Sequence, residues 1–357
     1  MFKEVRAKSQ RRKEVFPKPF LVGHPVAGVS SRLRSLVQSA PTSSPVKGVC
    51  PVSNAVQDES VVTHPSVVAA PITVAPSVDR RIDAIRVIIV NNLLHDPEDL
   101  SDVAFEDPEF DELAWINQER YIAGLALPNI EKNVKNLAIR PEVLTLHLSQ
   151  VTPKVVADFD ADAVVLSGTL RDFDYYRPDM IERFSKFVTT TEVPVLGICG
   201  GHQLVGQAFG ANIITLDRKF PFERRNNRLN EYQYRYVKIV KDDPIFDRID
   251  DRSDTRHTGR HSRTDILRVW QNHGLMVDRL PEGFEQLATG YLCPLQMMVK
   301  RTARQLIYTV QFHIEKSFED WDRKKSFWDH HVESRDGRII FENFLVEALK
   351  HRVSLEA

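Results

Sequence analysis

The feature that most restricts the fold of this chain is an alternation of two kinds of segment between residues 84 and 210. The run IRVIIV at 85–90 is apolar except for one arginine, which indicates a strand covered on both faces, as parallel sheets require. Further runs, PEVLTLHL, ADAVVLSG and VPVLGICG, alternate with helix-like stretches at 112–124, 152–159, 178–190 and 201–210. This alternation predicts an α/β fold with a mostly parallel sheet flanked by helices.

The chain beyond Gly210 has a different pattern, with strand-like runs that follow one another directly. These runs are YQYRYVKIV, DILRVWQNH, FEQLATG, LQMMVKR and QLIYTVQFH, and we expect some of them to be antiparallel. The segment IIFENFLVEALKHR at 339–352 predicts a closing helix.

Residues 1–80 show neither pattern. From about Val26 to Ser77 the chain is rich in Ser, Pro, Val, Ala and Thr, with few aromatic residues and no sustained period. Such a segment cannot bury enough apolar surface to offset its conformational entropy. We therefore expect a disordered tail over residues 1–80, acting as a linker or a docking arm, and one globular domain over residues 81–357.

Composition argues against several classes of partner. The chain has 48 Lys and Arg residues against 49 Asp and Glu residues, so no net charge attracts it to nucleic acid or to an anionic membrane. No stretch approaches the roughly 18 apolar residues that span a bilayer. Cys50, Cys199 and Cys293 have no spacing typical of a disulfide framework or a zinc site, which fits a reducing compartment. We expect a cytoplasmic protein.

One cysteine lies among glycines in VLGICGGHQ at 195–203, where a strand is predicted to end. A sharp turn from strand to helix of this kind exposes a nucleophilic side chain, and its neighbours must be small to avoid a clash. The amino end of the following helix favours a thiolate, and the N–H of Gly200 can face a developing oxyanion. Cys199 is the candidate nucleophile, and a buried structural cysteine is the alternative.

A cysteine nucleophile needs a base, and that base needs an acceptor that fixes its tautomer. In IYTVQFHIE at 307–315, His313 ends an apolar strand and Glu315 follows two positions later. The H-x-E spacing therefore supplies a candidate base and its orienting group from one strand end.

Together, GICGGHQ and QFHIE resemble the class I, or triad-type, glutamine amidotransferases, whose usual patterns are G-[IV]-C-x-G-H-Q and [FY]-H-P-E. ADAVVLSG is similar to the strand before that family's oxyanion loop. VWQNHGLMVD is similar to a stretch of the carbamoyl-phosphate synthase small subunit, whose glutaminase domain is the closest in motif. The resemblance covers roughly residues 84–350 and implies a mostly parallel sheet flanked by helices, with a flavodoxin-like core.

Carried over by position, the resemblance implies a γ-glutamyl thioester on Cys199, with His313 as acid and base and Glu315 as its orienting group. The backbone N–H groups of Gly168 and Gly200 would form the oxyanion hole. In the same resemblance, His202 is a structural residue of the helix rather than a second base. The two charged ends of glutamine would be held by Gln203, Asn272, His273 and Gly274.

The sequence departs from the family at several points. Residues 167–170 read Ser-Gly-Thr-Leu instead of S-G-G-P or N-G-P-G, which bears on the oxyanion hole, and Ile314 replaces the usual proline. The segment 316–338 is longer than expected; its adjacent histidines, His330 and His331, are poorly spaced for a metal site. We interpret the basic residues of 218–228 as a solvated loop, with a phosphate or carboxylate contact as the alternative.

No G-x-x-x-x-G-K-[ST] or G-x-G-x-x-G stretch occurs, so we expect no nucleotide-binding loop, and neither a cofactor nor a metal. Because amidotransferases of this class pass ammonia to a second active site, the resemblance implies that L-glutamine is the substrate and that the partner is a separate synthase subunit. Two alternatives remain open. One is a γ-glutamyl hydrolase or peptidase that uses the same residues alone, and the other is a non-catalytic binding module of the same fold.

Overall fold

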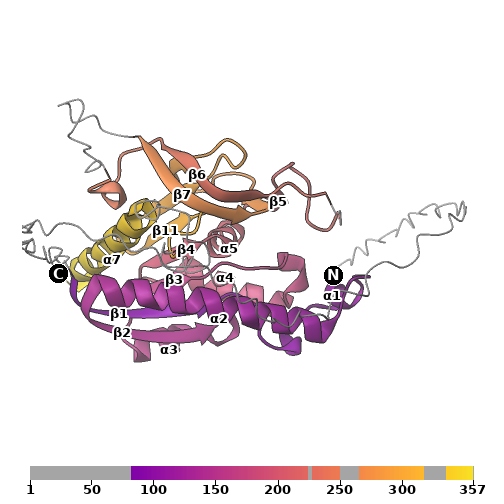
Figure 1. The fold of residues 1–357 in the computed structure, drawn as a ribbon. Coiled ribbons are helices and arrows are strands. Elements are labelled where there is room, and N and C mark those ends of the chain that lie inside the picture. Colours follow the sequence, from indigo (N-terminus) through magenta and orange to yellow (C-terminus); the bar gives the residue numbers. More distant parts are fainter. Residues whose placement is uncertain (1–81, 224–226, 250–264, 317–334, 357) are drawn as a thin grey trace, which may run out of the picture. The chain divides into compact units, whose positions relative to one another are not determined.

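The computed structural model describes residues 82–223, 227–249, 265–316 and 335–356, so the expected tail, residues 1–80, lies outside the described residues. Within them, a mixed sheet forms the centre of the domain (Figure 1). Its strands follow the spatial order β2 (Ala138–His147), β1 (Ile82–Asn91), β3 (Ala163–Leu166), β4 (Val195–Ile198), β11 (Leu306–Val310), β10 (Met297–Arg301), β9 (Glu285–Thr289), β6 (Glu231–Ile239) and β7 (Ile266–His273).

The sheet changes character halfway across. From β2 to β11 each strand is parallel to its neighbour, and from β11 to β7 each strand is antiparallel to its neighbour. The alternating first half of the sequence therefore builds the parallel part, and most of the later strand-like runs build the antiparallel part. This arrangement confirms the predicted mostly parallel α/β sheet.

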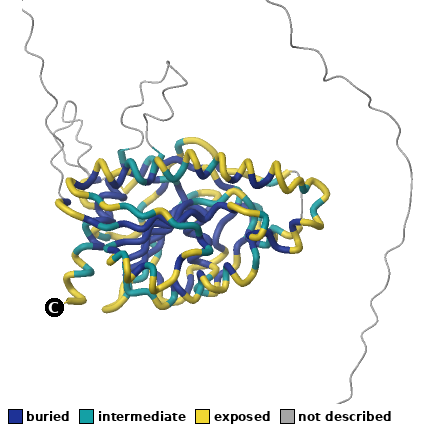
Figure 2. Tube along the Cα trace, turned by 90° about the horizontal axis from the view of Figure 1, so that it is seen from below, coloured by how far each residue is buried: buried dark blue, intermediate teal, exposed yellow. Residues whose placement is uncertain are grey.

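The strand predicted at 85–90 is covered on both faces, as its apolar composition requires. Val87 and Ile89 belong to one hydrophobic cluster, and Ile88 and Val90 belong to the cluster on the other face. All four side chains are fully buried. Figure 2 shows the strands as a dark, buried layer beneath helices whose outward residues are exposed.

Helices pack on both of these clusters. On one side lie α7 (Arg335–Glu356) and the carboxyl-terminal half of α2 (Glu112–Leu137), and on the other lie α3 (Pro153–Asp158), α4 (Pro178–Thr190) and α5 (Gly200–Ala208). The remaining described helices are short: α1 (Asp102–Phe105) and the 3-10 helices η1 (Pro97–Asp99), η2 (Leu148–Gln150), η3 (Phe173–Tyr175) and η4 (Pro244–Phe246). In the described part of the chain, no helix combines the length and the apolarity that a membrane crossing needs.

The helix predicted at 112–124 continues to Leu137, so its predicted end is wrong. Gly124 and Pro128 both disfavour a helix interior, and Pro128 has no N–H to donate to the preceding turn. Ile130 and Val134, one turn apart beyond this proline, are fully buried in the core. Burial of this apolar face outweighs the local cost of the two helix-breaking residues.

The short strands β5 (Ile213–Thr215) and β8 (Leu275–Val277) were not predicted from the sequence. They pair antiparallel in a small sheet of their own. Each has only three residues, which is too short to show a two-residue period. Their pairing matters for the site because β8 begins directly after Gly274.

We expect Gly124→Ala to raise the free energy of unfolding by about 0.5–1 kcal/mol, because alanine loses less backbone entropy in a helix. A Cβ at this position of α2 would enter open space. In the control Gly206→Ala, the new Cβ would lie 2.8 Å from Cγ2 of Val277, so this variant should be less stable than the wild type. Urea denaturation followed by circular dichroism measures both; a loss of stability in Gly124→Ala would contradict the expectation.

Candidate active site

Cys199 lies at the turn between β4 and α5, in a strained backbone conformation. Its φ of 51° and ψ of −104° lie outside the regions that residues with a side chain normally adopt. The turn is held on both sides: the Cys199 N–H donates to the carbonyl of Val310 on β11 at 2.8 Å, and the Cys199 carbonyl accepts the first helical hydrogen bond of α5, from Gln203, at 3.1 Å. The predicted elbow is therefore present in the structure.

The glycines around Cys199 are required by close packing. A Cβ on Gly197 would lie 2.8 Å from the carbonyl of Gly201, and a Cβ on Gly201 would lie 2.8 Å from that of Leu166. A Cβ on Gly200 would lie 2.5 Å from the backbone nitrogen of Thr169. Real side chains do not tolerate such distances from backbone atoms, so only glycine lets the chain turn this tightly beneath the cysteine.

Gly168 lies between the cysteine and the histidine. A Cβ on Gly168 would be 3.6 Å from Cβ of Cys199 and 3.4 Å from Cε1 of His313. The preceding residue, Ser167, is fixed by Asn92, whose backbone N–H donates to Oγ at 3.0 Å and whose Nδ2 donates to the carbonyl at 2.6 Å. The altered loop thus keeps Gly168 beside both groups.

His313 and Glu315 form a close pair. Nδ1 of His313 is 2.6 Å from Oε1 of Glu315, and both residues are largely buried. Burial by itself lowers the pKa of His313, but the carboxylate of Glu315 and the sulfur of Cys199 raise it well above its ordinary value. Burial raises the pKa of Glu315, whereas His313 lowers it below its ordinary value. Each group thus favours the charged form of the other, so the pair stabilises a proton that His313 takes from a neighbouring group.

Two distant elements hold this pair in place. The backbone N–H of His313 donates to the carbonyl of Trp270 on β7 at 2.8 Å, and Nδ2 of Asn133 on α2 donates to the carbonyl of Glu315 at 3.0 Å. Ile314, which replaces the family's proline, is buried between them with 2% of its surface exposed. Burial of Ile314 and these two hydrogen bonds fix the backbone without the proline.

A cavity of about 410 Å³ opens beside Cys199. It brings together the cysteine and the sequence-predicted binding residues, and it adds several residues that the sequence did not indicate. Its lining consists of Thr169, Leu170, Arg171, Asp172, Cys199, Gln203, Arg228, Asn230, Tyr232, Asn272, His273, Gly274 and Leu275.

The predicted binding residues line the cavity in different ways. Nε2 of Gln203 donates to the carbonyl of Leu275 at 3.0 Å and to Oε1 of Gln311 at 3.2 Å. Nδ1 of His273 is 2.9 Å from the carbonyl of Leu275, and its Nε2 is 3.1 Å from a carboxylate oxygen of Glu231. These contacts fix the side chains of Gln203 and His273 against β8 and β6.

The sequence analysis assigned no site role to three charged residues of the cavity: Arg171, Asp172 and Arg228. Arg228 donates from one nitrogen to both carboxylate oxygens of Asp172, at 2.7 and 2.9 Å, and from another to the carbonyl of Pro221. The sequence places Arg228 in a loop that is predicted to be solvated, but its side chain is mostly buried. Asp172 and Arg228 lie 56 residues apart, so no local pattern could have joined them.

The loop that carries Gly168 is tied to α2. Arg171 lies with its guanidinium carbon 3.9 Å from the ring centre of Trp115 and its Nε 3.5 Å from Oε1 of Glu119. Burial raises the pKa of Glu119 to about 7, while Arg171 and the N–H of Leu94 act in the opposite direction. The loop is thus attached through a buried carboxyl group that no sequence pattern indicates.

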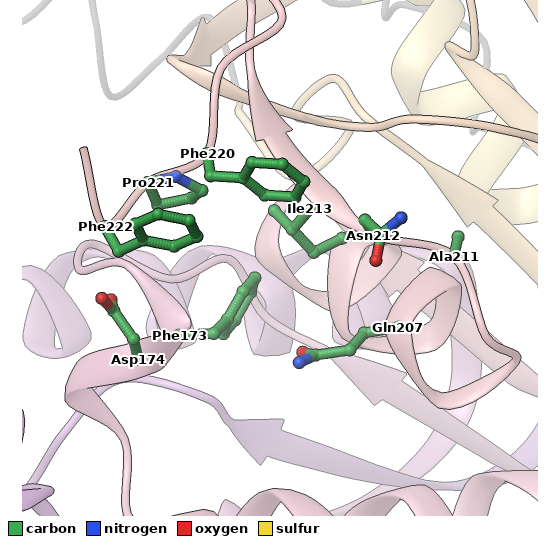
Figure 3. A pocket seen from close by; sticks show the side chains of 9 residues that line it. All are labelled: Phe173, Asp174, Gln207, Ala211, Asn212, Ile213, Phe220, Pro221 and Phe222. Carbon is green, nitrogen blue, oxygen red and sulfur yellow. The ribbon is translucent and has the colours of Figure 1, made fainter. Parts of the chain in front are cut away.

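A second cavity, of about 280 Å³, is lined in part by Phe173 and Asp174 of η3. Figure 3 shows Phe220, Pro221 and Phe222 on one side of it, facing Phe173 and Gln207. The residues that line it include no cysteine or histidine. Of these two cavities, only the one beside Cys199 is lined by a thiol.

Other residues singled out in the sequence do not line the cavity beside Cys199. His202 is fully buried, with Nδ1 2.7 Å from Oγ1 of Thr309, and burial lowers its pKa to about 3. A buried ring that stays neutral fits the structural role predicted for His202 in α5. Cys293 is also fully buried, as expected for a core residue. Most of segment 316–338, with His330 and His331, lies outside the described residues.

Comparison with known proteins points to one family. The family model described as glutamine amidotransferase class-I matches residues 126–330. The glutamine-hydrolysing GMP synthase of Alteromonas mediterranea is 28% identical over 165 residues, which cover 46% of this chain and 27% of that protein. A glutamine-hydrolysing GMP synthase subunit of Methanothermobacter thermautotrophicus is 28% identical over 159 residues, which cover 44% of this chain and 63% of that protein. The chain thus spans less than two thirds of the length of either relative.

A solved structure supports the fold. The crystal structure of a protein described as a GMP synthase subunit, from Thermoplasma acidophilum, superposes with a TM-score of 0.50 and 19% identity, over 76% of this chain and 98% of that one. These relatives are GMP synthases, so the predicted special likeness to the carbamoyl-phosphate synthase small subunit is not supported. That likeness rests on residues 269–278, a stretch too short to separate members of one family.

We expect Glu315→Gln to lower the pKa of His313 by about 1–3 pH units, because the carboxylate charge is lost while burial remains. The ring proton signals of His313, followed by NMR against pH, measure this. Glu285→Gln, which changes an exposed carboxylate paired with Lys241, is the control and should leave His313 unaffected. An unchanged pKa in Glu315→Gln would show that the pair is not an ion pair.

Proposed function

The chain belongs to the class-I glutamine amidotransferases, since the family model matches 126–330 of its 357 residues, and on this premise we propose that it hydrolyses L-glutamine to glutamate and ammonia. One observation carries the proposal. A strained cysteine and a histidine–glutamate pair meet at Gly168, beside a cavity with charged groups of both signs.

The first step is attack by sulfur. Cys199 gives its thiol proton to Nε2 of His313, the ring nitrogen that Glu315 leaves available. The thiolate then forms a bond to the side-chain amide carbon of glutamine, and the C=O electron pair moves to oxygen. Glu315 stabilises the imidazolium and holds the ring in one orientation.

The oxyanion formed in this step needs donors that are already in place. We assign this role to the N–H groups of Gly168, which lies beside Cys199, and of Gly200, which follows it; the close packing of Gly200 on Thr169 keeps the two loops together. Because these donors belong to a braced backbone, they need no reorganisation when charge develops on the oxygen. The Thr-Leu sequence at 169–170 is compatible with this role.

The cycle closes with two proton transfers through His313. The imidazolium protonates the leaving nitrogen, the C–N bond breaks, and ammonia leaves a γ-glutamyl thioester on Cys199. His313 then takes a proton from water as the water attacks the thioester, and glutamate leaves as the proton returns to sulfur. The cycle consumes one water for each glutamine, returns Cys199 and His313 to their starting states, and needs no cofactor.

The cavity suits the charged end of a free α-amino acid. Arg228 offers a cation for the α-carboxylate, and Asp172, its ion-pair partner, offers an anion for the α-ammonium group. The remaining contacts come from residues that line the same cavity: Gln203, Asn272, His273 and Gly274. This charge pattern favours glutamine or another γ-glutamyl compound with a free α end.

The ammonia, in this proposal, passes to a separate synthase subunit that works with this protein in the cytoplasm. The relatives named GMP synthase, one of them a single subunit, support a synthase partner. The stand-alone γ-glutamyl hydrolase is the second candidate, because the same cavity would admit its substrates. An amidotransferase should be slow alone and faster with its synthase, whereas a hydrolase should turn over freely.

We expect the glutamine-like electrophile 6-diazo-5-oxo-L-norleucine to add once to the wild type and not to Cys199→Ala, as measured by intact mass. Cys293→Ala is the matched control, since that cysteine is fully buried outside the cavity, and this variant should still be labelled. Excess L-glutamine should slow the labelling. A wild type that stays unlabelled would count against a working glutamine site.

We expect Arg228→Gln to raise KM for glutamine about 10- to 100-fold with a smaller change in kcat, because a charge-assisted contact to the carboxylate is lost. Steady-state ammonia release measures both constants. Lys219→Gln, an exposed residue of the same basic segment, is the control and should leave KM unchanged. Equal KM values for wild type and Arg228→Gln would remove Arg228 from substrate binding.

A further inference from the structure

Gln311 is a buried residue in contact with the reactive sulfur. It follows β11, two residues before His313, and is fully buried. Its Nε2 lies 3.7 Å from Sγ of Cys199, within the range for a hydrogen bond to sulfur. Its backbone N–H donates to the carbonyl of Gln296 at 2.8 Å, so the residue is held from the main chain as well.

The orientation of the Gln311 amide follows from a chain of hydrogen bonds. The carbonyl of Leu275 can only accept, so the atom of Gln203 that faces it at 3.0 Å must be the donor Nε2. That same nitrogen lies 3.2 Å from Gln311, so the atom of Gln311 that it meets must be the acceptor Oε1. The other end of the Gln311 amide, Nε2, therefore points its N–H toward Cys199.

We propose that Gln311 is a further catalytic residue, whose amide N–H stabilises the Cys199 thiolate, and that Gln203 is the positioning residue that fixes this amide. The inference rests on the proposed glutaminase reaction for its purpose. Its geometric basis is independent of that reaction: it is the chain of hydrogen bonds that runs from the Leu275 carbonyl through Gln203 and Gln311 to the sulfur of Cys199.

The sulfur has a different partner in each protonation state. As a thiol, Cys199 can donate to the carbonyl of Asn272, 3.9 Å from Sγ. When its proton passes to His313, the sulfur can no longer donate, and its negative charge makes it a stronger acceptor for the Gln311 N–H. In the thioester the sulfur is uncharged, and the same hydrogen bond is weak. Gln311 thus favours the thiolate over the thiol, without an added positive charge in the site.

The test is the rate at which iodoacetamide alkylates Cys199 as a function of pH, because only the thiolate reacts. Mass mapping of the Cys199 peptide separates this residue from the other cysteines. In Gln311→Met, which keeps the bulk and removes the donor, we expect the thiol pKa to rise by about 1 pH unit and alkylation at neutral pH to slow about tenfold. Gln203→Met should produce a smaller rise.

Gln271→Met is the matched control. Gln271 is equally buried, but its amide donates to Gln296 at 2.8 Å, so the thiol pKa should stay as in the wild type. If Gln311→Met fails to fold by near-UV circular dichroism, Gln311→Glu keeps the shape and replaces the donor with an acceptor. It should raise the thiol pKa further.

The proposal is overturned if the thiol pKa is unchanged in the folded Gln311 variants, or if Gln271→Met raises it equally. Alkylation needs no glutamine, so the two proposals fail separately. A shifted thiol pKa in a protein that neither hydrolyses glutamine nor is labelled by 6-diazo-5-oxo-L-norleucine would support the role of Gln311 and count against the glutaminase. Glutamine hydrolysis by the wild type, with an unchanged thiol pKa in the Gln311 variants, would support the glutaminase and refute the role of Gln311.

Discussion

The site depends on the strained turn at Cys199. A residue with a side chain is held at a φ of 51°, and this conformation persists because its surroundings leave no alternative. β4 is paired on both sides, with β3 and β11, and α5 begins one residue after the cysteine. The crowding at Gly197, Gly200 and Gly201 leaves no room for the turn to relax. Stability of the parallel sheet thus maintains a conformation that places the sulfur at its carboxyl edge.

The topology of the sheet explains why His313 lies beside this turn. β11 is the parallel neighbour of β4, so its carboxyl end lies at the same edge, and the chain continues from it through Gln311 to His313. The antiparallel half also reaches this edge: the carbonyl of Trp270 on β7 accepts the N–H of His313. The parallel half supplies Cys199 and His313, the proposed nucleophile and base, and the antiparallel half supplies walls of the cavity.

The parts of the site that could be predicted from the sequence are those whose residues lie close together in the chain. The glycines around Cys199 and the H-x-E spacing of His313 and Glu315 are local patterns, and their interpretation needed only the rule that strand ends share an edge. The contact of Asn133 with the Glu315 carbonyl spans 182 residues, and that of Gln311 with Cys199 spans 112. Such pairs depend on how α2 and β11 lie in the finished fold, and no spacing in the sequence encodes them.

Glu119 shows how the fold accepts a cost to fix the loop of Gly168. Its side chain is fully buried, and its pKa is raised from 4.5 to about 7 mainly because burial disfavours the charged form. The folded state therefore binds a proton that the unfolded chain has lost, so this carboxyl favours folding most below pH 4.5 and least once the pH has risen through about 7. Near neutral pH the group is close to half charged, and Arg171 and the N–H of Leu94 offset part of the burial cost. An apolar residue there would avoid this cost, but it could not hold Arg171, which connects the loop of Gly168 to α2.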